Sequence, residues 1–216
     1  MKKLMYLLLG VISIASCKKA SQKISENGCL SRIGITRLSG ADSVIVAGLM
    51  TNNNLPATNL VFYTYQTYNA LDQQNQMADF QIAEAAYLQN GLPLFFYDET
   101  YGFENGVLNG PSPLSSQTVS LDTRPTLNLQ MLKDSFLVQD QRIEYNKNIA
   151  AGLKDSCLVA VFGYYNLNID YSNEAADFVK AWYVHPQNSQ WPQGYFRDDN
   201  GAVILFKPLS SNGNVP

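Results

Sequence analysis

The sequence offers few side chains for nucleophilic chemistry: three cysteines and a single histidine, His185, among 216 residues. An imidazole can act as a general base only if a nucleophile and an orienting carboxylate lie beside it in the fold, and the spacing reveals no such partners. The sequence also lacks a G-x-S-x-G motif. We therefore expect a protein that is not an enzyme. The alternative is a hydrolase that uses His185, with Cys157 or a serine as its nucleophile.

Metal binding also finds little support in the spacing of ligand-type residues. No His/Cys cluster has the spacing of a zinc site, and residues 198–201 are too short for a twelve-residue calcium loop. Asp98-Glu99 and Asp198-Asp199 could share a hard cation if the two halves of the chain faced each other. Otherwise they are turn and surface carboxylates. We predict no metal and no cofactor.

Cys17 stands at the end of Ile14-Ala15-Ser16-Cys17, after two lysines and a short apolar run. This pattern has the charged and apolar regions of a signal peptide. The run is well short of the roughly 20 apolar residues of a transmembrane helix, which is the alternative. The segment resembles the lipobox of bacterial lipoprotein precursors. The resemblance implies that residues 1–16 are removed and that the Cys17 thiol carries a diacylglycerol, which anchors the protein in a membrane.

Residues 17–28 are polar and aperiodic, so we expect a flexible tether. Lys18 and Lys19 stand where lipoproteins retained in the inner membrane carry an Asp. This resemblance implies a lipid-anchored protein of the bacterial cell envelope, in the outer membrane and facing the periplasm. Without residues 1–16 the chain has 13 basic and 18 acidic residues, a net charge of about −5. No basic cluster suits a phosphate backbone, so we expect no nucleic-acid partner.

If Cys17 carries lipid, Cys29 and Cys157 remain as a pair in a compartment where disulfides persist. A bridge would close a loop of more than a hundred residues, which the chain-entropy model values at somewhat over 4 kcal/mol. The alternative is two buried thiols that act as small hydrophobic side chains. The sequence alone leaves both possibilities open.

Residues 29–108 predict a helix followed by strands. Val46, Leu49 and Met50 repeat at helical spacing after Ser39, whose side chain we expect to cap the helix; the β-branched run at 44–46 leaves a strand as the alternative.

Residues 60–68 predict a strand in which alternation places Tyr63 and Tyr65 on one face with Val61, and Phe62 on the other. Asn90-Gly91 predicts a tight turn between strands at 80–88 and 92–100.

Residues 109–126, rich in Pro, Ser and Thr, are predicted to link the first half to a second one at 127–216. Asn128 is expected to cap a helix that carries Leu129, Leu132 and Phe136 on one face. Strands are expected at 157–165, 178–185, 194–197 and 202–206. The pattern predicts an α+β fold with antiparallel sheets and packed helices, in two similar halves.

Two runs resemble known modules. The run AEAAYLQNGLPLFFYDETYGFENGVL is similar to the sheet of fungalysin/thermolysin-type propeptide domains, and FVKAWYVHPQNSQWPQGYFRDDNGAVILF is similar to the C-terminal half of a PepSY domain. With the lipobox, the chain resembles uncharacterised lipoproteins of Bacteroidota. The resemblance implies two cystatin-like or PepSY-like halves that bind peptides or proteins without catalysis. Because no protease domain follows within the sequence, any protease inhibition is expected to act in trans.

Aromatic side chains are the best candidates for a ligand surface. Rings with a polar tip suit surfaces that meet peptides or proteins, and the candidates are Tyr63, Tyr65, Trp182, Tyr183 and Trp191. The alternative is that these rings fill the core. We expect a binding module for a peptide or an envelope protein, with a structural subunit of an envelope assembly as the alternative.

Overall fold

The computed structural model describes residues 29–110, 118–142, 157–170 and 174–208. The predicted signal peptide, Cys17 and the tether at 17–28 lie outside these residues, as does part of the predicted linker. Among the residues described, no helix is long and apolar enough to cross a membrane.

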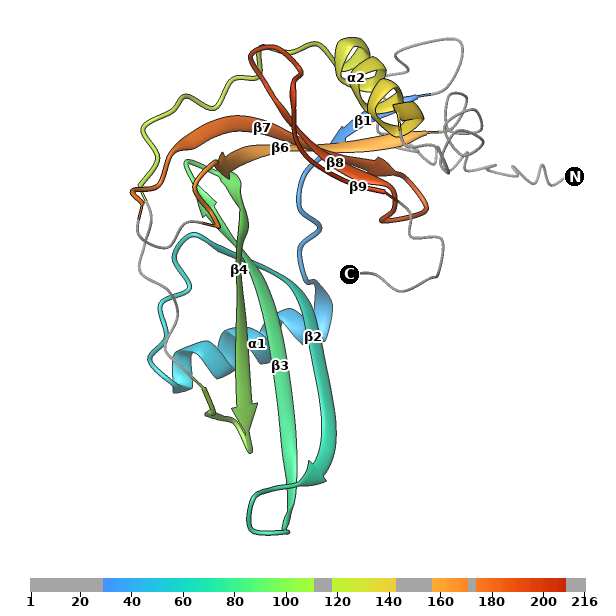
Figure 1. Ribbon diagram of the computed structural model, residues 1–216. Helices are drawn as coiled ribbons and strands as arrows, with labels where there is room; N and C mark the ends of the chain where they lie inside the picture. Colours follow the sequence, from blue (N-terminus) through green and yellow to red (C-terminus); the bar gives the residue numbers. More distant parts are fainter. Residues whose placement is uncertain (1–28, 111–117, 143–156, 171–173, 209–216) are drawn as a thin grey trace, which may run out of the picture.

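The described chain forms a mixed α/β fold dominated by one large, mostly antiparallel sheet (Figure 1). The strand order is β2-β3-β4-β6-β7-β8-β9, with β1 beside β6 and β5 beside β4. The elements in chain order are β1 (Leu30–Ile33), α1 (Gly40–Asn52), β2 (Leu60–Leu71), β3 (Met77–Gln89), β4 (Leu92–Glu104), β5 (Val107–Leu108), α2 (Leu129–Arg142), β6 (Leu158–Asn166), β7 (Phe178–Pro186), β8 (Gln193–Arg197) and β9 (Val203–Lys207). The predicted combination of antiparallel strands and packed helices is confirmed at this level.

The strands β2, β3 and β4 form a long meander, and α1 lies across one of its faces (Figure 1). Val46, Leu49 and Met50 of α1 are buried against this face, as their spacing predicts. The turns also follow the sequence: Asn90 and Gly91 join β3 to β4 with φ of 53° and 78°. Such left-handed pairs match the twist of the flanking strands.

The second meander, β6 to β9, carries α2 on one face. Leu132 and Phe136 of α2 are buried in this interface. Asn128 caps the helix as predicted, because its Oδ1 accepts a hydrogen bond of 2.8 Å from the Met131 N–H.

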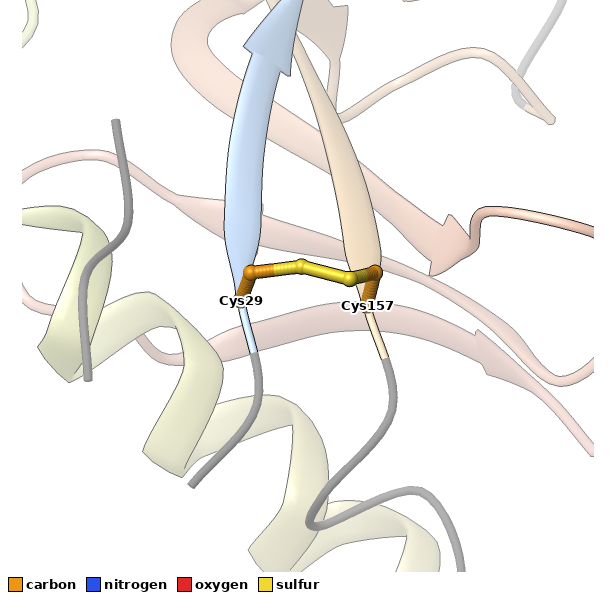
Figure 2. Close-up of a disulfide and its surroundings, with 2 residues drawn as sticks. All are labelled: Cys29 and Cys157. Atoms are coloured by element: carbon orange, nitrogen blue, oxygen red, sulfur yellow. A yellow bond between two sulfur atoms is a disulfide. The ribbon is translucent and has the colours of Figure 1, made fainter. Parts of the chain in front are cut away.

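Strand β1 lies parallel to β6 and so belongs to the second meander, although it precedes α1 in the chain. Just before these two strands, a disulfide joins Cys29 to Cys157, with 4.4 Å between their Cα atoms (Figure 2). The bridge therefore ties the start of the described chain to the start of β6.

The two meanders meet where β4 runs beside β6. The pairing is parallel and is limited to Leu94 and Tyr164. A glycine is needed next to this point, because a Cβ on Gly163 would lie 2.5 Å from the carbonyl oxygen of Pro93. The small residue thus permits the close approach of the two backbones.

Two local predictions are wrong. The register of β2 shifts between Phe62 and Thr64, so Tyr63 is an extra residue in a β-bulge and Tyr65 packs towards α1 on the side of Phe62. Strict alternation had put Tyr65 on the opposite side. At the start of α1, Ser39 occupies the cap position but its side chain makes no capping hydrogen bond.

Candidate functional site

The structure separates the five aromatic residues predicted to form a ligand surface. Trp182 is only 1% exposed and packs under α2, so its place on a ligand surface is corrected to a place in the core. Tyr65 faces α1, whereas Tyr63 projects from the bulge in β2. Trp191 lies in the loop between β7 and β8, before a cis Pro192. Tyr183 is half-buried on the face of the second meander opposite α2.

A cluster of five rings lies on that face, and we call it the aromatic corner: Phe95, Phe96, Tyr165, Tyr183 and Tyr195. Tyr195 is its centre, with the ring centroids of Phe96 and Tyr183 at 5.0 and 4.9 Å. Phe95 and Tyr165 approach Tyr195 with their rings steeply inclined, at 5.2 and 5.4 Å. These are favourable separations for aromatic pairs.

Phe96 is the most unusual member of the aromatic corner. Its φ is 67°, a left-handed conformation that a bulky residue rarely adopts. It arises where β4 changes partners: pairing with β3 is interrupted between Ala86 and Leu88, while Leu94 pairs with β6. At this interruption of the β3–β4 pairing, the ring of Phe96 contacts the second meander and is still 43% exposed. Strained residues of this kind cluster at binding and active sites.

The tyrosines of the corner stay neutral at physiological pH. Burial raises the pKa of Tyr183 to about 12. Burial also raises the pKa of Tyr195, with further contributions from Tyr183 and Asp98. Their hydroxyl groups therefore act as uncharged hydrogen-bonding groups. The Tyr183 hydroxyl donates to Oε1 of Gln193.

The carboxylate of Asp98 borders the corner near Tyr195, on the side of the first meander, and Glu84 lies near Asp98. Burial, followed by the negative charge of Glu84, raises the pKa of Asp98. Tyr63 lies in the same electrostatic environment: burial and then the charges of Asp98 and Glu84 raise its pKa to about 12. Ring faces beside carboxylates attract cationic groups such as Lys and Arg side chains.

His185 lies at the end of β7, with its ring 5.1 Å from that of Tyr183. Its Nδ1 is 2.8 Å from the carbonyl oxygen of Pro186 and 2.9 Å from that of Ser189. Since both carbonyls only accept, Nδ1 is assigned the proton. In the described part of the chain, no hydroxyl or thiol forms a hydrogen bond with this imidazole.

Asp198 lies in the turn that follows β8, but it is fully buried rather than a surface carboxylate. Its oxygens accept hydrogen bonds from the hydroxyl of Thr126 at 2.6 Å, the N–H of Thr126 at 2.8 Å, the N–H of Leu127 at 3.1 Å and the indole N–H of Trp182 at 2.8 Å. Nζ of Lys180 is 3.5 Å away. Burial acts to raise the pKa of Asp198, but these hydrogen bonds outweigh it and lower the pKa.

The carboxylate oxygens of Asp198 are therefore bonded to donors of the protein rather than to the hard cation that the sequence analysis considered. Across residues 29–110, 118–142, 157–170 and 174–208, no group of three or more His, Cys, Asp or Glu side chains is placed to hold a metal ion.

No protein-family model matches the chain, and no curated protein matches it either. The sequence indicated Tyr183 as a candidate and Asp98 only as a cation ligand, and it did not single out Phe96 or Tyr195. The break in β4 and the pairing of two distant meanders bring them together, and no short sequence motif signals either feature.

Proposed function

We propose that the protein is a lipid-anchored, non-catalytic binding module of the bacterial cell envelope, and that the aromatic corner binds a segment of a peptide or another protein. Cys17 would carry the lipid and place the module on the outer membrane. Protease inhibition in trans is one form that this binding would take.

The observation that carries the proposal is the partial exposure of a strained aromatic residue. Phe96 keeps 43% of its surface exposed although its ring packs on Tyr165 and Tyr195. Exposed rings with neighbouring tyrosine hydroxyls are typical of protein-binding surfaces, where aromatic residues contribute much of the affinity. Asp98 near Tyr195 favours a segment that carries Lys or Arg, beside Lys207, whose Nζ already lies 5.8 Å from the Phe96 ring centroid.

We further propose that residues 29–108 and 127–216 are two similar cystatin-like or PepSY-like halves. The support is the repeated order of a helix followed by an antiparallel meander, α1 with β2–β4 and α2 with β6–β9. Strand β1 departs from this division because it pairs with β6.

Site-specific photo-crosslinking in the native cells tests the proposed binding. Phe96→p-benzoylphenylalanine places the crosslinker in the aromatic corner. Tyr68→p-benzoylphenylalanine is the matched control, because Tyr68 is also an exposed ring but lies near the far end of β2 and stacks on Phe80. We expect a discrete crosslinked protein or peptide from position 96 and none from position 68. Equal crosslinking from both positions, or none from position 96, would contradict the proposal.

A structural subunit of an envelope assembly is the second candidate, and the surface of α1 favours it. Val44 and Ile45 of this helix are 72% and 42% exposed, although the helix buries Val46 on its other side. A helix with apolar side chains all round is usually covered. Crosslinks from Val44→p-benzoylphenylalanine, without any from position 96, would favour this candidate.

A further inference from the structure

A groove lies where β1 and β4 diverge from β6. Both strands lie along the same edge of β6, but β1 pairs as far as Val161 and β4 pairs only at Tyr164. Phe162 and Gly163 lie between these two pairings, with the carbonyl group of Pro93 close to Gly163. The space between the strands forms a groove of about 420 Å³ that we call the fork groove. This volume is in the range of pockets that hold small ligands.

Two arginines line the fork groove: Arg32 from β1 and Arg37 from the segment that leads to α1. The guanidinium carbon of Arg32 lies 5.3 Å from the ring centroid of Phe162 and 5.6 Å from that of Trp182. These separations are cation–π contacts, which orient the guanidinium group over the two rings. The charge of Arg32 is therefore held at one side of the groove.

The groove lacks a negative charge to balance these arginines. None of its lining residues is acidic, and within the described parts of the chain neither arginine forms an ion pair. This is notable in a protein with a net charge of −3. Both arginine side chains are exposed to solvent, and their planar guanidinium groups are suited to form paired hydrogen bonds with the carboxylate of a ligand.

The rest of the wall is largely apolar. Val61, Leu92 and Val161 line the groove beside the arginines. An inorganic anion would contact the arginines but leave the apolar wall uncovered. A carboxylate next to an apolar side chain would contact both the arginines and the apolar wall.

We infer that the fork groove binds the free C-terminal carboxylate of an extended peptide whose last side chains are apolar. Arg32 and Arg37 hold the carboxylate, and the apolar wall receives the terminal side chain. This site is separate from the aromatic corner, and its test does not depend on that proposal.

Fluorescence anisotropy on the full-length protein tests the inference. The probe is a labelled hexapeptide that ends in Val-Leu, used once with a free carboxyl group and once as the C-terminal amide. The variants are Arg32→Met and Arg37→Met, which keep an apolar stem but remove the charge. Arg142→Met is the matched control, because it removes one exposed positive charge at the end of α2. Circular dichroism verifies that each variant is folded.

We expect the free acid to bind about tenfold more tightly than the amide, the effect of one charge-assisted contact. Arg32→Met and Arg37→Met each remove about tenfold in affinity for the acid and bring it close to that of the amide, while Arg142→Met changes neither. Equal binding of acid and amide, no saturable binding of the acid, or an unchanged preference in both groove variants overturns the inference. Binding of dodecanoate by calorimetry without any peptide binding also overturns it, because the site would then recognise a fatty acid.

Discussion

The buried carboxylate of Asp198 is expected to be a major source of stability, and Asp198→Asn tests this. An Asn side chain retains one acceptor oxygen and places an N–H₂ group where the other oxygen was. With the N–H₂ group at the Oδ1 position, the N–H donors of Leu127 and Trp182 lose their acceptor. With it at the Oδ2 position, it faces the charged Nζ of Lys180, while the Thr126 N–H keeps its bond to Oδ1. Depriving buried donors of partners costs about 1–3 kcal/mol each. We therefore expect a loss of about 2–4 kcal/mol in the free energy of unfolding.

The neighbouring residue provides a matched control. Asp199 is exposed and pairs with Arg197 at 3.0 Å on the surface, so Asp199→Asn is expected to change stability by less than about 0.5 kcal/mol. Urea unfolding followed by tryptophan fluorescence measures both variants at pH 7. The reasoning is refuted if the two variants unfold at the same urea concentration with the same slope.

The pH dependence of stability gives an independent check. The pKa of Asp198 is lowered in the folded protein, against about 3.9 for an Asp in an unfolded chain. Its contribution is therefore complete above about pH 4 and is lost as the pH falls through the folded-state pKa. We expect the difference in stability between wild type and Asp198→Asn to shrink below about pH 4, and a constant difference down to pH 2 would contradict this.

Further predictions concern the Cys29–Cys157 disulfide, the close contact of β4 and β6 at Gly163, and the lipid anchor at Cys17. The double variant with Cys29→Ser and Cys157→Ser removes a disulfide between residues 128 apart. It is expected to lower the free energy of unfolding by up to about 4–5 kcal/mol. Urea unfolding against the oxidised wild type measures this loss, and equal stability would contradict a bridge. Gly163→Ala introduces a Cβ 2.5 Å from the β4 backbone and is expected to lower the free energy of unfolding by about 1–3 kcal/mol. Gly48→Ala, with open space around its Cβ in α1, is the control and is expected to stabilise by up to about 1 kcal/mol. Cys17→Ser is expected to abolish incorporation of an alkyne-labelled fatty acid, and persistent labelling would refute the lipobox interpretation.

Local signals predicted much of the fold. The Asn-Gly turn at 90–91 and the cap at Asn128 depend on residues within one turn of each other, and both form as expected. The spacing of Leu132 and Phe136 likewise identified the buried face of α2. In each case the physical cause lies in a short window of sequence.

Features that depend on distant partners were not predictable in this way. The bulge at Tyr63 reverses the face of Tyr65, and alternation alone carries no sign of it. Asp198 looks like an ordinary turn residue, because the donors that bury it come from Thr126 and Trp182 on other elements. The aromatic corner has the same origin, since Phe96 reaches Tyr195 only through the junction of the two meanders.

The position of the disulfide also determines how the domain would bear a mechanical load. A force applied to the chain before Cys29 passes through the covalent bridge to Cys157 and enters β6, without first pulling β1 away from its neighbour (Figure 2). Strand β6 pairs along its whole length with β7, so the load enters a strand that is held by a long ladder of backbone hydrogen bonds. In the reduced protein the same force would act first on the four residue pairs of β1, which would detach before the rest of the sheet.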